Sequence, residues 1–143
     1  MCSHEMGRAF QRVSGISDRR IVVVPNGIDQ SVFHPPKDAA EKFALRGALG
    51  LPVTGPLILS VCSVIPRKGV DLLVAAWESV LARYPEAHLV VVGSKTVRPT
   101  VGEANARATI ADYLKGIEDS IARLSNPERV ILTGEVSNVQ DYY

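Results

Sequence analysis

The chain has 143 residues, of which 46% are hydrophobic, enough to bury the core of one ordinary soluble domain. Its 16 Lys and Arg nearly balance its 15 Asp and Glu, and no basic stripe interleaved with aromatic residues is present, which excludes a nucleic-acid footprint. No apolar run approaches the roughly 18 residues that span a bilayer, so no transmembrane segment is expected.

The cysteines and the N-terminal residues indicate the compartment. Cys2 and Cys62 have neither a CxxC spacing nor a nearby histidine pair, which argues against a metal site and predicts reduced thiols. Residues 1–20 are rich in charge and lack the apolar stretch of a secretory signal. Together these features predict a cytoplasmic protein.

The first third of the chain contains one strand-like run and a connector. Residues 21–24, reading IVVV, are followed by Pro-Asn-Gly, which predicts a buried strand that ends in a turn, with a short helix before it. Prolines and glycines between residues 29 and 55 surround a helical stretch near residues 39–49. We therefore place a domain boundary near residues 26–36.

The remainder alternates strands and helices. Strands are predicted over residues 57–62, 88–92 and 130–133, with a helix after each of the first two and a loop over residues 99–103. The apolar positions of these helices follow a 3.6-residue period. They are Leu73, Ala76, Trp77, Val80, Leu81 and Tyr84 in the first helix, and Ile110, Leu114, Ile117, Ile121 and Leu124 in the second. The pattern predicts an α/β fold, a Rossmann-like doubly wound parallel sheet buried on both faces.

The chain stops soon after its third predicted core strand. A new segment begins at Val136 and ends at Tyr143 before it acquires an apolar period or a cap. Doubly wound sheets commonly have about five or six strands. We therefore expect the sheet of a longer parent protein to continue beyond this chain, and a fragment of this kind to self-associate through its exposed sheet edge.

Three loops are candidates for a ligand site, because ligands of open parallel sheets bind outside the carboxyl ends of the strands. They are Ser63 to Gly69 after the first core strand, Gly93-Ser94 after the second, and residues 134–136, which include Glu135 and Val136, after the third. Their small residues are expected to let a ligand approach the backbone closely.

The first loop carries the most specific signal. Arg67 and Lys68, followed by Gly69, place two cations where a helix N-terminus already presents roughly half a positive charge. A bound phosphate would offset this charge, using Lys68 and free amides of the first helical turn. The alternative is a solvated basic pair compensated by Asp71.

Other polar residues carry less information. His4, His34 and His88 lie far apart without a partner at catalytic or metal spacing, so surface or satisfied core histidines are expected. Asp29 follows a turn glycine and is expected to serve the turn. A Rossmann dehydrogenase is excluded because no GxGxxG follows any strand, whereas a non-catalytic regulatory or protein-binding α/β module stays open.

Three sequence blocks resemble the retaining GT-B glycosyltransferases of family 4, the group 1 glycosyltransferases. Residues 21–33, reading IVVVPNGIDQSVF, are similar to the passage from the acceptor domain to the donor domain. Residues 57–93, reading LILSVCSVIPRKGVDLLVAAWESVLARYPEAHLVVVG, are similar to the family's strand, phosphate loop, helix and second strand. Residues 130–143, reading VILTGEVSNVQDYY, resemble the third strand and the loop that contacts the base.

The resemblance implies a domain organisation. Residues 1–25 would be the end of the acceptor domain and an interdomain strand, residues 26–56 a linker with a lead-in helix, and residues 57–143 part of the nucleotide-sugar-binding domain. Two glutamates of the family, which position the donor sugar and the ribose, would lie beyond residue 143. The chain alone is therefore expected to be inactive, with no catalytic residue of its own.

The resemblance also implies roles for individual residues. Lys68 is similar to the lysine that holds the donor diphosphate, Glu135 and Val136 resemble the base contacts, and Gly93-Ser94 borders the same cleft. Many members carry an arginine five residues before the lysine, where this chain has Ser63. Either Arg67 supplies part of that charge or the diphosphate is held with less help.

The implied reaction transfers a sugar from a nucleotide-sugar donor to an unknown acceptor hydroxyl with retention of the anomeric configuration. Negative charge grows on the leaving diphosphate, and Lys68 with the helix start at Gly69 would stabilise it. No metal and no cofactor is expected, because the family generally works without a DXD-type metal site and this chain has no DXD sequence.

Overall fold

The computed structural model describes residues 2–96 and 104–143, with side chains from residue 110 onward in the second range. The loop predicted over residues 99–103 lies outside the described residues. The chain divides into two compact units, Met1–His34 and Pro35–Tyr143. The assignment of chain segments to an acceptor and a donor domain stays a prediction.

The smaller unit begins with helix α1, His4–Ser14, which confirms the helix expected there. The Ser3 side chain caps it by accepting a hydrogen bond from the Met6 amide at 3.1 Å, and Gly15 ends it in the left-handed conformation with φ 67°. A 3-10 helix, Asp18–Arg20, follows.

The strand predicted over residues 21–24 is wrong. These residues form no strand and are not part of the sheet, although the backbone of Ile21 is extended. Ile21 and Val23 lean against Gly7 of α1, while Val22 and Val24 are 71% and 66% exposed. The run alternates as a strand would, but β-branched residues form a strand only where a neighbouring strand and a packed surface support them.

The larger unit contains the predicted parallel sheet of three core strands, and their order is β1-β2-β3. Strand β1, Leu57–Val61, pairs with β2, His88–Val92, and β2 pairs with β3, Val130–Gly134. Leu57 lies opposite His88, and Leu89 lies opposite Val130. The register between β2 and β3 shifts near Val91 and Val92, so that Val92 pairs with Gly134.

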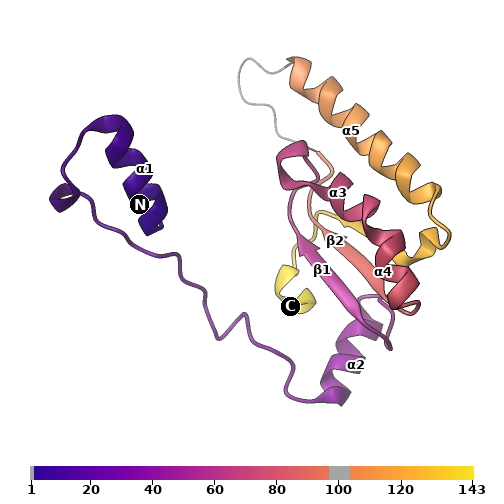
Figure 1. Cartoon of the computed structure of the whole chain (residues 1–143). Coiled ribbons are helices and arrows are strands. Elements are labelled where there is room, and N and C mark those ends of the chain that lie inside the picture. Colours follow the sequence, from indigo (N-terminus) through magenta and orange to yellow (C-terminus); the bar gives the residue numbers. More distant parts are fainter. Residues whose placement is uncertain (1, 97–103) are drawn as a thin grey trace. The chain divides into compact units, whose positions relative to one another are not determined.

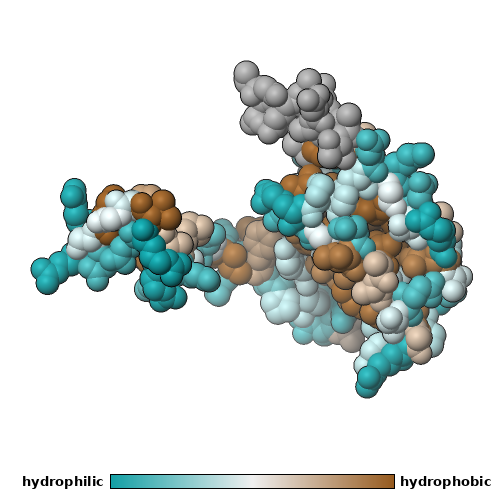
Figure 2. Space-filling model, turned by 45° about the horizontal axis from the view of Figure 1, so that its top comes forward, coloured by the Kyte–Doolittle hydropathy of each residue, from teal (hydrophilic) through white to brown (hydrophobic). Residues whose placement is uncertain are grey.

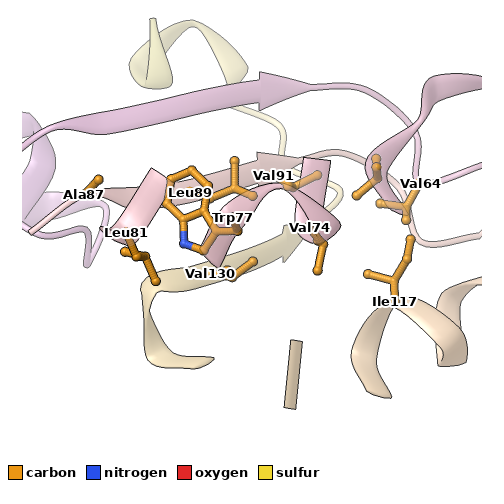
Figure 3. Packing of buried hydrophobic residues seen from close by; sticks show 10 residues of the cluster. Val64, Val74, Trp77, Leu81, Ala87, Leu89, Val91, Ile117 and Val130 are labelled. Atoms are coloured by element: carbon orange, nitrogen blue, oxygen red, sulfur yellow. The ribbon is translucent and has the colours of Figure 1, made fainter. Parts of the chain in front are cut away.

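One face of the sheet is covered by the two crossover segments, which contain α3, Val70–Ala75, α4, Trp77–Arg83, and α5, Ala104–Ala122 (Figure 1). The buried cluster on this face joins helix residues to strand residues (Figure 3). Its members are Val64, Val70, Val74, Trp77, Leu81, Ala87, Leu89, Val91, Ile117 and Val130.

The other face is covered by the segment before β1 and by the C-terminal residues. Helix α2, Ala39–Ala48, confirms the predicted helix, and Leu51 beyond its end packs against Val90 and Val92 of β2. A 3-10 helix, Val139–Tyr142, forms in the final segment and contributes to the same cluster. Both faces are thus packed, which confirms the predicted α/β fold.

The helix predicted between β1 and β2 is divided at Ala76. The Ala76 carbonyl accepts a three-residue bond from the Ser79 amide at 3.1 Å as well as the regular four-residue bond from the Val80 amide at 3.3 Å, so the helix tightens at this point. Ala76 and Tyr84, expected on the apolar stripe, are exposed, whereas Val70 and Val74 are fully buried. The buried stripe is therefore shifted toward the start of the helical segment.

Candidate functional site

The carboxyl ends of the three strands are joined by backbone hydrogen bonds. The Val64 amide donates to the Ser94 carbonyl at 3.0 Å, and the Gly93 amide donates to the Gly134 carbonyl at 2.9 Å. These bonds link the loop after β1 to the loop after β2, and the loop after β2 to the end of β3. The three predicted loops therefore lie together at one edge of the sheet.

The loop after β1 is a compact turn that presents two cations. Residues Pro66–Lys68 form a 3-10 helix, in which the Lys68 amide donates to the Ile65 carbonyl at 2.9 Å. Gly69 then adopts φ 68°, a left-handed conformation that suits glycine, and α3 begins at the next residue. Arg67 and Lys68 thus lie within one turn of a helix start, as predicted.

Arg67 and Lys68 are exposed, and so is Ser63 at the other end of the loop. Among the described residues, neither cation has a carboxylate within 4 Å. Their positive charge is therefore open to solvent and to an anionic ligand. Asp71 makes no direct ion pair with either of them. The solvated basic pair, with Asp71 in the first turn of α3, stays open as the alternative to a phosphate site.

Asp71 instead pairs with Tyr113, a residue of α5 that the sequence did not single out. The Tyr113 hydroxyl donates to the Asp71 carboxylate at 2.6 Å and accepts from the Asp71 amide at 3.2 Å. The bond from Tyr113 lowers the pKa of Asp71, while burial and the bond to Asp71 raise the pKa of Tyr113. One first-turn amide that we expected to be free for a phosphate is therefore occupied.

The two residues of the loop after β2, Gly93 and Ser94, both make contacts that stabilise the fold. Gly93 has φ 149°, and a Cβ at this position would lie 2.1 Å from the Cys62 carbonyl oxygen. The missing side chain thus makes room for the backbone of the neighbouring loop, and the expected ligand role of Gly93 stays a prediction. The Ser94 hydroxyl donates to the Thr96 carbonyl at 2.7 Å, so this side chain stabilises its own turn.

The loop after β3 combines an open glycine with a packed valine. Gly134 has φ 79°, and no atom lies within 4 Å of where its Cβ would be. Glu135 is exposed, but the Val136 side chain packs against the apolar cluster that contains Val90 and Val92. A base contact by the Val136 side chain therefore competes with its place in the core.

One cavity lies between α2, β1 and the C-terminal 3-10 helix, and its walls do not include these loops. Its volume is about 270 Å³, and none of the eight predicted site residues lines it. Its walls include Leu45, Leu49, Leu57, Leu59 and Tyr142, together with Lys42, Arg46 and Asp141. We assign the candidate site to the strand ends, because the cations and the open glycine lie there.

The remaining polar residues behave mostly as expected. The Asp29 carboxylate accepts from both the amide and the hydroxyl of Ser31, which lowers its pKa and makes it a turn residue. His88 lies beside Arg129 and the Glu86 carbonyl, and burial followed by the Arg129 charge lowers its pKa. Within the described ranges, no helix is long and apolar enough to cross a bilayer.

Comparison with solved structures shows which fold the chain has. The chain superposes on a glycosyltransferase from Rickettsia africae with a TM-score of 0.76 at 20% identity, covering 99% of this chain and 34% of that one. It also matches HepE of Anabaena, solved in complex with UDP and glucose, with a TM-score of 0.72 at 23% identity over 99% of this chain and 33% of HepE. The fold is that of GT-B glycosyltransferases.

Sequence comparison identifies the family. The model of the family "Glycosyl transferases group 1" matches residues 41–143, so the chain belongs to the group 1 glycosyltransferases. A D-inositol 3-phosphate glycosyltransferase of Xylanimonas cellulosilytica is 46% identical over 100 residues, which are 68% of this chain and 23% of the relative. A GDP-mannose-dependent phosphatidylinositol monomannoside mannosyltransferase of Corynebacterium glutamicum is 39% identical over 80 residues, 54% of this chain and 20% of the relative. The chain thus spans about a fifth to a quarter of these two proteins.

Proposed function

We propose that the protein containing this chain transfers a sugar from a nucleoside-diphosphate sugar to an acceptor hydroxyl with retention of the anomeric configuration. In this proposal the chain supplies part of the site for the donor's diphosphate and base, and does not catalyse transfer alone. The observation that carries the proposal is the exposed pair Arg67 and Lys68, beside the carboxyl ends of a parallel sheet and without a described acidic partner. Membership of the family makes a nucleotide sugar the expected anion.

The chemistry of the loop fits a leaving diphosphate. Negative charge develops on the diphosphate as the bond to the sugar breaks. Positive groups already fixed beside the diphosphate stabilise this charge and lower the activation barrier of transfer. The Lys68 ammonium is a point charge suited to a phosphate, and the left-handed Gly69 turns the backbone into α3 immediately beside it. Ser63 faces solvent at the opposite end of this loop and supplies no charge.

Lys68→Ala in the full-length protein tests this role. We expect sugar transfer to fall by about 10²-fold or more, because one stabiliser of transition-state charge is lost. The assay uses UDP- and GDP-sugars, with inositol phosphates among the acceptors because several relatives are named D-inositol 3-phosphate glycosyltransferases. Activity within threefold of the wild type would show that Lys68 does not hold the diphosphate.

Ser63→Arg is the complementary variant. If the diphosphate is bound more weakly because Ser63 stands where many family members have an arginine, nucleoside diphosphates should bind more tightly to this variant in titration calorimetry. Unchanged affinity would favour the alternative in which Arg67 already supplies the charge. A protein that binds no nucleoside diphosphate at all would instead favour the non-catalytic module.

A further inference from the structure

Tyr113 of α5 and Asp71 of α3, which are 42 residues apart in the chain, form two hydrogen bonds with each other. The tyrosine hydroxyl is both acceptor and donor, because it receives the Asp71 amide and gives its proton to the Asp71 carboxylate. Both the backbone and the side chain of Asp71 are therefore held by one atom of α5. Helices α3 and α5 pack against each other, which supports this contact.

Asp71 lies two residues after Gly69, which ends the loop that carries Arg67 and Lys68. Gly69 forms the junction, since the Leu73 amide of the next helical turn donates to the Gly69 carbonyl at 3.2 Å. At the other end of the loop, the Val64 amide is held by the Ser94 carbonyl. The loop that carries Arg67 and Lys68 is thus anchored at both ends.

Asp71 is also the acidic residue nearest in sequence to the two cations. Asp71 is three residues from Lys68 in sequence, and the structure places no Asp71 oxygen within 4 Å of either cation. The short bond from Tyr113 accounts for this, because it directs the carboxylate toward α5. The same bond lowers the pKa of Asp71. An aspartate is charged at neutral pH even without this bond, so a released carboxylate would still attract a cation.

We propose that Tyr113 is a positioning residue of the donor site: its hydroxyl holds Asp71 away from Lys68 and so keeps the lysine free for the diphosphate. This inference rests on the proposed function, since it assigns Tyr113 a role toward the diphosphate that Lys68 holds. Without the hydroxyl, Asp71 competes with the diphosphate for Lys68.

The test is a set of variants of the full-length protein, with UDP and GDP binding measured by titration calorimetry. Tyr113→Phe should weaken binding about three- to fivefold, the range expected for one exposed ion pair that competes with the ligand. Tyr113→Phe combined with Asp71→Asn should regain most of that affinity, because the competing charge is gone. A purely structural role predicts no such rescue. Tyr84→Phe is the matched control, since Tyr84 is 52% exposed and precedes β2 at the opposite end of the strands.

The outcomes separate this inference from the proposed function. If Lys68→Ala binds UDP and GDP as the wild type does, the diphosphate role of Lys68 is wrong. If Lys68→Ala loses binding while Tyr113→Phe keeps the wild-type affinity, or if the double variant binds no better than Tyr113→Phe, the positioning role is overturned. Thermal unfolding of each variant identifies a folding defect, and the double variant still decides the question where Tyr113→Phe is less stable.

Discussion

Gly93 is the residue at which the fold and the candidate site depend most directly on one missing side chain. Its backbone conformation, φ 149°, is one that side chains rarely adopt, and its Cα approaches the Cys62 carbonyl so closely that a Cβ would overlap it at 2.1 Å. The sequence predicted that small residues at the strand ends serve ligand approach. The structure shows that this glycine first allows the loops after β1 and β2 to come together.

Gly93→Ala is therefore expected to lower the free energy of unfolding by about 3 kcal/mol or more, because backbone strain and overlap with backbone atoms add. Gly134→Ala is the control, since the same methyl group would meet open space and only the cost of φ 79° remains, about 1 kcal/mol. Urea unfolding of both variants measures the difference. Equal losses would show that the contact with Cys62 is not what requires glycine.

At the scale of elements, the helices over the sheet are tied to each other by polar contacts as well as by the apolar core. Glu78 of α4 reaches the end of α5, where its carboxylate accepts from the Ser125 amide at 2.5 Å and from the Ser125 hydroxyl at 3.3 Å. Tyr113 makes the corresponding link between α5 and α3. Helices α3 and α4 are therefore each joined by side-chain hydrogen bonds to α5 or to the residues that follow it.

Glu78→Ala should lower the free energy of unfolding by about 1 kcal/mol, the typical net contribution of an intramolecular hydrogen bond. It should also speed amide hydrogen exchange near residues 121–125, because the Ser125 amide loses its acceptor. Glu86→Ala is the control, since that exposed side chain makes no described hydrogen bond. Similar exchange in the two variants would contradict a link between α4 and α5.

Elements were predictable where the sequence carries its own periodicity and stop signals. The apolar strands β1, β2 and β3, each ended by small or turn residues, and helix α2 with its Asp38 cap all form close to their predicted positions. The break at Ala76 was not predictable, because an apolar stripe continues across it. The run at residues 21–24 failed for the opposite reason: its propensity favours a strand, but pairing depends on a neighbour.

At the scale of the whole molecule, the sheet of this chain has open edges. β1 and β3 are the outer strands, and apolar surface is exposed on the drawn face of the larger unit (Figure 2). Ile58 of β1 is 36% exposed. Unpaired strand edges and open apolar surface both favour association.

We expect the 143-residue chain to associate in a concentration-dependent way in sedimentation velocity, and to transfer no sugar in an assay of the same sample. Ile58→Lys should reduce the association, because a charge on an edge strand disfavours pairing with another strand. Val22→Lys is the control, since Val22 is also a β-branched apolar residue, is 71% exposed and lies outside the sheet. A chain that stays monomeric at every concentration, or that turns over a nucleotide sugar, would contradict this expectation.

The sequence by itself determined the parallel α/β class, the three strands of the sheet, the loops at their carboxyl ends and the membership of a glycosyltransferase family. The class, the strands and the loops follow from local patterns, because buried parallel strands are continuous apolar runs and the loops between them carry glycine and proline. The family follows from the resemblance of three sequence blocks to group 1 glycosyltransferases. Only the tertiary structure decided what each loop residue contacts. The bonds from Tyr113 to Asp71, the Cys62 carbonyl against Gly93 and the packing of Val136 all join residues that are distant in sequence. Such contacts depend on strand register and helix placement, which no local pattern encodes.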